Sequence, residues 1–319
     1  MILERRASTV LYNFLRSTPR TGRWLLPANV CPIVPAVFAK AGKTFQFVDI
    51  EQTSLCLNQA ESLAILDRGD SRYAGLLFVR TYGHQGDFEA FFRAIKRIDR
   101  ELLIVDDRCA ARPQFNESGG VADLELYSSG YAKFVDLGWG GWGFLRTGLP
   151  YNRESMPFEP ADHDALVEQL RRLLRSGGRF EYPKSNWLDT TPPTMDASDF
   201  EVLVSRRATE AAEHRTQLNS IYAAALDKWA GPKDCRDWRF SLFCPEPTAL
   251  LQVIFASNHF ASAHYQSLVP IFGCGEAPVA ESVGRRVVNL FNDFRYTPER
   301  ARQLAEIVRA HLSAPALRR

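Results

Sequence analysis

The sequence lacks the signals of several large classes of protein. Its 319 residues contain no apolar run long enough to cross a bilayer, and polar residues interrupt the segment after Arg5 and Arg6, so no secretory signal peptide is indicated. The net charge is only +2, which is too small to favour nucleic acid or a membrane surface as a partner. We therefore expect a cytoplasmic protein that binds neither.

The usual spacings of metal-binding and nucleotide-binding residues are also missing. The six cysteines include no CxxC pair, and His259 and His264 are five positions apart, whereas a helical metal pair is four apart. No GxGxxG segment lies between the first strand and helix, where a generic α/β nucleotide-binding protein has one. We interpret the cysteines as reduced thiols and predict no metal.

What the sequence does contain is an alternation of strand-like and helix-like segments. Several strand-like segments are continuous apolar runs, which are typical of strands covered on both faces. This alternation predicts an α/β protein with a mostly parallel sheet. The predicted strands are residues 45–48, 74–79, 102–105 and 123–127, and the predicted helices are 9–15, 88–98 with Asp87 as N-cap, and a helix from about Asp162 to Gly177.

The pattern changes in the last third of the chain. A long helix is predicted from Phe200 to about Trp229, and residues 178–193 before it are predicted to form a loop. Short strands are predicted at 240–243 and 249–254, and the last helix has Thr297 as N-cap. The length allows two cores. We therefore predict a large domain over residues 1–205 and a smaller one over 206–319.

Polar residues follow three of the predicted strands. They are residues 82–84, the pair Asp106 and Asp107, and residues 128–133, which end at Lys133. Ligands of parallel α/β sheets bind where strands end at their carboxyl edge. These three groups therefore converge if their strands are neighbours.

The same residues have both a chemical and an ordinary interpretation. A lysine amine can form an imine with an aldehyde, and burial favours this by lowering the pKa of the amine. A carboxylate from Asp106 or Asp107 can hold a proton on a ring nitrogen, and Ser128 can donate to a phosphate. Equally, Lys133 can be a surface residue, which spacing alone favours, the aspartates can cap a helix, and Ser128 can belong to a simple turn.

In the order and spacing of its motifs, nearly the whole chain resembles the DegT/DnrJ/EryC1/StrS aminotransferases, a branch of the fold-type-I enzymes that use pyridoxal 5′-phosphate (PLP). The resemblance implies a PLP-binding large domain with an αβα arrangement and a small α+β C-terminal domain. The matching segments are residues 26–30, 41–50, 81–87, 103–110, 128–133, 138–143, 278–281 and 286–290.

The resemblance also implies roles for single residues. Lys133 corresponds to the lysine that forms the Schiff base and acts as the acid and base, and Asp107 to the partner of the pyridine nitrogen. Ser128 and Ser8 correspond to phosphate contacts. The remaining implied contacts are Tyr82 with the cofactor, Asn186 with the phosphate in a partner subunit, and His264 and Tyr265 with the substrate.

The chain departs from the family pattern at several of these positions. Cys31 stands where the family has an aromatic residue that stacks on the cofactor ring. Arg108 replaces a small residue, Ala110 replaces a glutamine, and the glycine expected before Ser8 is absent. These changes affect the predicted affinity for cofactor and substrate more than the central chemistry.

The resemblance implies an aminotransferase that takes an amino group from glutamate or glutamine and gives it to a keto sugar, nucleotide-linked, or to a related carbonyl compound. It also implies a homodimer with the active site at the interface. A sugar dehydratase of the same fold is disfavoured, because those relatives have histidine where this chain has Lys133. The alternative of another class is a catalytically silent homologue that serves as a binding or scaffold subunit.

Overall fold

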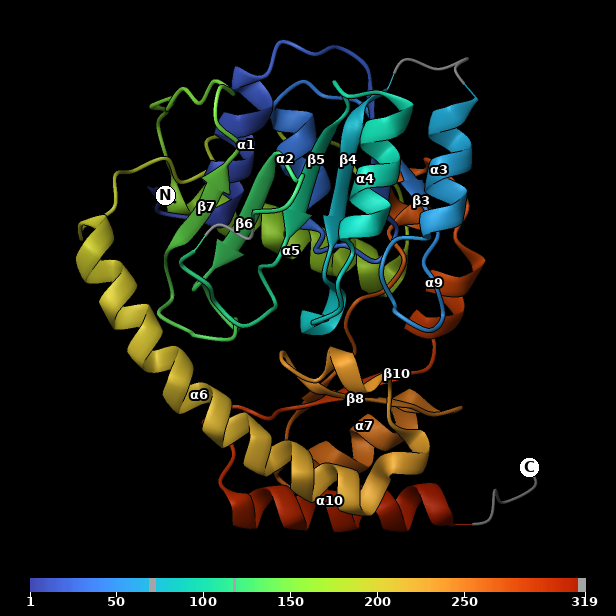
Figure 1. Cartoon of the computed structure of the whole chain (residues 1–319). Coiled ribbons are helices and arrows are strands. Elements are labelled where there is room, and N and C mark those ends of the chain that lie inside the picture. Colours follow the sequence, from blue (N-terminus) through green and yellow to red (C-terminus); the bar gives the residue numbers. More distant parts are fainter. Residues whose placement is uncertain (69–72, 117–118, 315–319) are drawn as a thin grey trace.

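The computed structural model describes residues 1–68, 73–116 and 119–314, and its main body is a seven-stranded sheet with helices on both faces (Figure 1). The strand order is β1-β7-β6-β5-β4-β2-β3. Strands β6, β5, β4, β2 and β3 are parallel, and β7 is antiparallel to both of its neighbours. The predicted α/β fold is confirmed. The strands are β1 (Ile2–Glu4), β2 (Arg23–Pro27), β3 (Phe45–Val48), β4 (Tyr73–Val79), β5 (Leu103–Asp107), β6 (Leu124–Ser128) and β7 (Gly141–Leu145).

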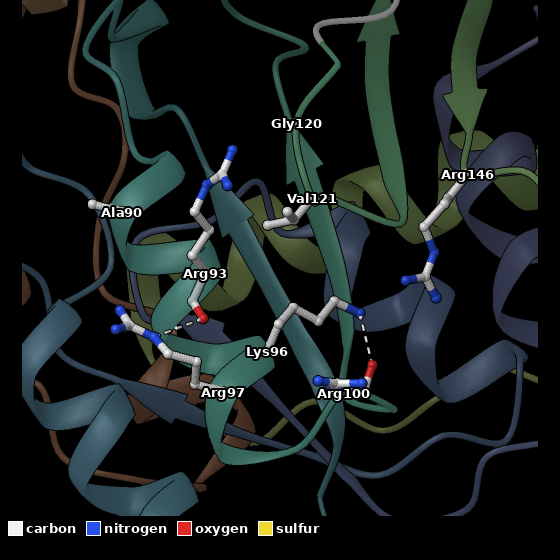
Figure 2. Close-up of a pocket in the computed structure, with 8 residues that line it drawn as sticks. All are labelled: Ala90, Arg93, Lys96, Arg97, Arg100, Gly120, Val121 and Arg146. Atoms are coloured by element: carbon white, nitrogen blue, oxygen red, sulfur yellow. Dashed lines mark hydrogen bonds between the residues drawn. The ribbon is translucent and has the colours of Figure 1, made fainter.

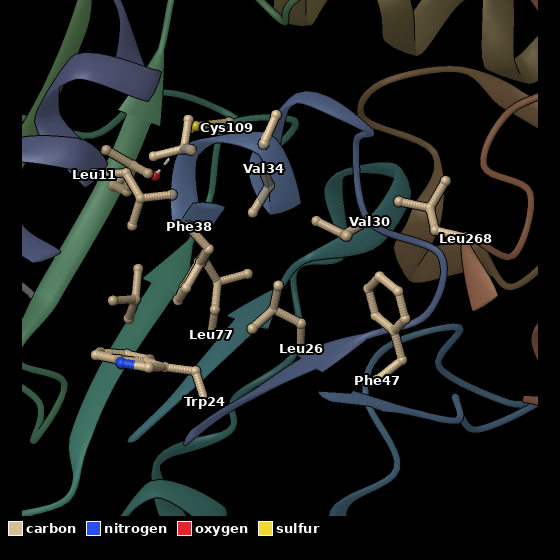
Figure 3. Packing of buried hydrophobic residues seen from close by; sticks show 14 of the residues in the cluster. Leu11, Trp24, Leu26, Val30, Val34, Phe38, Phe47, Leu77, Cys109 and Leu268 are labelled. Carbon is tan, nitrogen blue, oxygen red and sulfur yellow. Dashed lines mark hydrogen bonds between the residues drawn. The ribbon is translucent and has the colours of Figure 1, made fainter. Parts of the chain in front are cut away.

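Both faces of this sheet are covered by apolar side chains. Successive side chains on a strand point to opposite faces, so neighbouring apolar residues reach different clusters. In β4, Leu76 lies in the buried cluster that contains Phe91, whereas Leu77 lies in the cluster that contains Phe38 and Trp24 (Figure 3). The sheet is therefore the middle of three layers. One outer layer has α1 (Ala7–Ser17), α2 (Ile33–Lys40) and α5 (Pro160–Ser176), and the other has α3 (Gln59–Asp67) and α4 (Glu89–Ile98).

A smaller α+β unit follows in the C-terminal part of the chain, as expected. Its antiparallel sheet has the order β8-β10-β9 and packs against α7 and α10. The short helices α8 and α9 instead contribute to the core of the large sheet. The elements are β8 (Phe240–Phe243), α7 (Pro247–Ala256), β9 (Ala261–Ser262), α8 (Val269–Phe272), α9 (Pro278–Gly284), β10 (Val287–Leu290) and α10 (Pro298–Ser313).

The long helix α6 (Ala197–Leu226) connects the two units (Figure 1). Its first half packs against the large sheet, through Val204 among others, and its second half packs against the small sheet through Leu218 and Tyr222. The domain boundary near residue 205, which lies inside α6, stays a prediction. No helix in the described ranges, α6 included, is both long and apolar enough to cross a membrane.

Two local predictions are wrong. Residues 249–254 form part of the helix α7 instead of a strand, because Pro247 begins a helix whose residues Leu250 and Ile254 are buried four positions apart. The N-cap position of α4 is occupied by Phe88, one residue after Asp87, although the Asp87 carboxylate still accepts a hydrogen bond from Glu89 N at 2.8 Å. Thr297 caps α10 as predicted.

Candidate active site

The three groups of polar residues lie at adjacent strand ends. Strands β4, β5 and β6 are neighbours in the sheet and are all parallel, so their carboxyl ends share one edge. Tyr82 follows β4, Asp107 is the last residue of β5, and Lys133 lies five residues after the end of β6. The sheet thus brings together the residues that the sequence analysis placed at a common edge.

The Lys133 amine is surrounded by groups that favour its charged form. Burial by itself lowers the pKa of this amine, but the nearby groups of Tyr265, Cys109, Cys31 and Asp107 outweigh burial and raise it. The expectation that burial lowers the pKa of Lys133 is therefore wrong for the cofactor-free chain. Lys133 is an ammonium ion at neutral pH, and a carbonyl partner must meet it after it has lost a proton.

The structure distinguishes the two aspartates. Asp107 is 6% exposed, and its carboxylate accepts a hydrogen bond from Cys109 N at 2.9 Å and attracts Lys133. Burial raises the pKa of Asp107, which Lys133 partly offsets. Asp106 is fully buried and is bound by two arginines, with Arg80 Nη2 at 2.9 Å and Arg108 Nε at 2.7 Å. Asp106 is thus neutralised by protein groups, and Asp107 is the carboxylate associated with Lys133.

The turn that carries Lys133 is held by residues from the C-terminal part of the chain. Trp238 Nε1 donates to the carbonyl of Ala132 at 2.6 Å. The Arg215 guanidinium donates to the carbonyls of Lys133 and Phe134, at 3.4 and 3.1 Å. Ala132 itself has a φ of +56°, a strained value for a residue with a side chain. The position of Lys133 therefore depends on α6 and on the segment before β8.

The start of α1 offers a place for a phosphate. Arg6, in the N-cap position, makes no side-chain cap hydrogen bond, and the free N–H groups of a first helical turn attract anions. Ser8 lies in this turn. A Cβ atom on Gly141 would come within 2.0 Å of Ala7 N, so only glycine allows this approach, and Gly141 pairs with Ser128 across the sheet. Both serines predicted to bind phosphate therefore lie beside Gly141.

Three aromatic side chains line the neighbourhood of Lys133. The rings of Trp238, Tyr265 and Tyr82 have centroids 5.4 to 6.1 Å apart. The Tyr82 hydroxyl donates to the carbonyl of His264 and accepts from Tyr265 N at 2.8 Å, so it fixes this dipeptide instead of pointing freely toward a cofactor. Burial, together with Arg239 and Lys133, lowers the pKa of His264 and keeps its ring neutral at pH 7.

Asn186 and Cys31 are the two remaining positions that the sequence analysis discussed, and they lie in different surroundings. Asn186 is exposed beside the start of α5, where its backbone N–H donates to Asp162 at 2.8 Å, so its predicted contact with a second subunit stays a prediction. Cys31 lies just before α2 and is close enough to Lys133 and Tyr265 to affect their pKa values. Within the described ranges, no group of three His, Cys, Asp or Glu residues can hold a metal ion.

Sequence reasoning missed Arg215 and Trp238. Arg215 had a signal, because it interrupts a stripe of buried apolar residues on α6 that includes Ala208, Ala211 and Leu218. A charge in such a stripe indicates a specific buried partner. Trp238 had none, since its contact with Ala132 joins residues 106 positions apart.

The fold is that of known aminotransferases. A DegT DnrJ EryC1 StrS aminotransferase from Brucella abortus aligns with a TM-score of 0.71 and 19% identity over 98% of this chain and 86% of its own. Sugar aminotransferase CalS13 from Micromonospora echinospora aligns with a TM-score of 0.72 and 17% identity, over 97% of this chain and 86% of its own. DesV from S. venezuelae, solved in complex with a ketimine intermediate, aligns with a TM-score of 0.69 and 20% identity, over 98% of this chain and 85% of its own. No protein-family model and no curated relative matches the sequence.

Proposed function

We propose that this chain is a PLP-dependent aminotransferase. The observation that carries the proposal is the pairing of Lys133 with Asp107 at adjacent strand ends, in a fold shared with aminotransferases over nearly the whole chain. A buried lysine with a perturbed pKa beside a buried carboxylate is typical of an active site. Asp106, the neighbouring carboxylate, is already bound by two arginines and is unsuited to this task.

The residues at this edge fit the groups of the cofactor. When bound, PLP supplies an aldehyde that takes up an amino group and a pyridine ring that withdraws electrons. Lys133 would hold the aldehyde carbon through its amine and, once the amino group of the substrate has displaced that amine, would move the proton at the substrate α-carbon. Asp107 would keep the pyridine nitrogen protonated, since its carboxylate is buried at the same sheet edge as Lys133. Ser8, Ser128 and the start of α1 hold the phosphate.

The substrates follow from the resemblance to sugar aminotransferases such as CalS13. We propose glutamate or glutamine as the amino donor and a keto sugar, nucleotide-linked, as the acceptor. His264 and Tyr265 lie close enough to Lys133 for its charge to affect their pKa values, and we propose that both contact the substrates. We further propose a cytoplasmic homodimer in which Asn186 of one subunit, exposed in the single chain, completes the phosphate site of the other.

One observation favours the second candidate, a catalytically silent scaffold. Cys31, which is close to Lys133, cannot stack on a pyridine ring as an aromatic residue does. A scaffold predicts that the purified protein is colourless and takes up no PLP. The enzyme predicts an absorbance band near the visible edge that borohydride removes, in wild type but not in Lys133→Ala.

The reaction itself is tested with products. The protein is incubated with PLP, glutamate or glutamine, and a panel of keto sugars, and amino sugars are measured by mass spectrometry. Formation of an amino sugar that requires both donor and Lys133 supports the proposal. Uptake of PLP without any product from either donor would contradict the proposed reaction, and absence of uptake would contradict the proposed cofactor.

A further inference from the structure

A cavity lined by basic side chains lies at the opposite edge of the main sheet. Its volume is about 770 Å³, which is within the size range of small-molecule sites. The cationic lining residues are Arg93, Lys96, Arg97 and Arg100, all on or just after α4, and Arg146 just after β7 (Figure 2). The other lining residues are Ala90, Gly120 and Val121, so no acidic side chain lines the cavity among the residues that the structure describes.

This cavity is separate from the candidate active site. Asp123, which is bonded to Lys96, lies just before β6, whereas Ser128 is the last residue of that strand. At about 3.3 Å per residue, the two ends of β6 are roughly 16 Å apart. The cavity and the candidate active site therefore lie at opposite ends of β6.

The lining cations divide into two that contact the carboxylate of Asp123 and three that do not. Lys96 Nζ lies 2.6 Å and Arg146 Nη2 lies 2.8 Å from the buried carboxylate of Asp123. These two contacts hold Lys96 and Arg146 in place in the lining. Arg93, Arg97 and Arg100 are exposed around the cavity, and of these Arg93 has a carboxylate neighbour in Glu89 at 3.6 Å.

Two of the exposed arginines share one face of a helix. Arg93 and Arg97 are spaced at i and i+4 on α4, about one helical turn apart, and Arg100 lies two residues past the end of this helix. Like charges at this spacing destabilise a helix. The helix dipole favours Arg97 in the last turn of α4, but it does not favour Arg93 near the middle of the helix. An anion bound between the arginines removes this repulsion.

We propose that this cavity binds an anion with two or more phosphate groups. Guanidinium groups bind phosphate oxygens through paired N–H donors, and several of them on one wall suit several phosphates. The cavity also has room for more than a diphosphate, so the source is either a free polyphosphate or the phosphate chain of a nucleotide. The site is independent of the proposed transamination.

Binding of inorganic pyrophosphate to the PLP-saturated protein tests this directly by calorimetry. The Arg93→Gln/Arg97→Gln variant is expected to weaken binding at least about 10-fold, because each arginine contributes a charge-assisted contact. The matched control is Arg171→Gln/Arg175→Gln, which removes two exposed arginines at the same spacing on α5, where both pair with Glu168. This control is expected to bind as wild type does, and circular dichroism verifies that both variants fold.

Parallel titrations with ADP and adenosine identify the source of the phosphates. Tighter binding of ADP than of pyrophosphate, with no binding of adenosine, supports a nucleotide, and equal binding of ADP and pyrophosphate supports a free polyphosphate. The proposal is overturned if pyrophosphate does not bind, or if the two double variants lose affinity equally. It is also overturned if a single-stranded RNA binds through these arginines and pyrophosphate does not compete with it.

Discussion

The two edges of the main sheet each bury an aspartate near a lysine, but the two pairs are built differently. At one edge, Asp123 contacts Lys96 at 2.6 Å and Arg146 at 2.8 Å, so two cations neutralise one carboxylate. At the other edge, Asp107 and Lys133 attract each other without forming a direct ion pair among the described residues. Removing one partner of such a buried pair leaves an uncompensated charge and strongly destabilises a fold. Charges that are buried but not neutralised by each other remain available to a ligand.

The largest effect expected from this comparison is that of removing the Lys133 amine. Lys133→Ala is expected to reduce transamination by at least about 1000-fold, because no other amine can bind the aldehyde and move the proton. Steady-state kinetics measures the loss, and an unchanged far-UV spectrum verifies the fold. Normal turnover by this variant means that the active site has been assigned to the wrong residue.

The matching change at the opposite edge acts on stability. Asp123→Asn leaves Lys96, which is only 12% exposed, without its carboxylate, and is expected to lower the free energy of unfolding by about 3 kcal/mol. Urea unfolding measures this. The control Glu168→Gln breaks an exposed pair with Arg175 and is expected to cost less than about 1 kcal/mol. If Asp123→Asn lowers the specific activity of the folded protein instead, the two edges do not differ as described.

Asp107→Asn is expected to have the converse effect. The substitution keeps the shape and the oxygen that accepts from Cys109 N, so stability changes little. Without the negative charge of the Asp107 carboxylate, the pyridine nitrogen would no longer be kept protonated. Turnover is expected to fall about 100-fold, and PLP to bind more weakly. The two quantities are measured by kinetics and by cofactor titration. Asp106→Asn serves as the control, since it removes the buried carboxylate that Arg80 and Arg108 share and acts on stability. Equal kinetic effects from both variants would mean that the wrong aspartate has been chosen.

The comparison also shows which features a sequence reveals. The apolar runs of β4 and β5 and the polar residues at their ends are local, so the sheet and the positions of Asp107 and Lys133 were predictable. The apolar run at 249–254 was wrongly interpreted as a strand. Periodicity alone does not distinguish a buried strand from a buried helix in so short a segment. Burial and neighbouring charges are non-local, and for this reason the direction of the Lys133 pKa shift was not predictable.

The contacts that place Lys133 were beyond sequence reasoning for the same reason. Arg215 reaches the carbonyl of Phe134 from 81 positions away, and Trp238 is still further along the chain. Arg215 also lies where α6 passes from the large core to the small one, between Ala211 and Leu218. A periodicity argument finds the helix but does not find what one buried cation on it touches.

The smallest predicted effect concerns pH. Because the groups around Lys133 raise the pKa of its amine, the neutral form that binds an aldehyde is scarce at pH 7 and grows about tenfold for each pH unit. The rate of PLP uptake by the cofactor-free protein is therefore expected to rise steadily between about pH 6.5 and 8.5, as measured by stopped-flow absorbance against a model lysine. Asp107→Asn removes one of the charges that raise this pKa, so its uptake is expected to be faster at the lower pH, even though its final affinity for PLP is weaker. A rate that is independent of pH would mean that the amine is already neutral, and the contrast between the Lys133 and Lys96 environments would then not lie in charge.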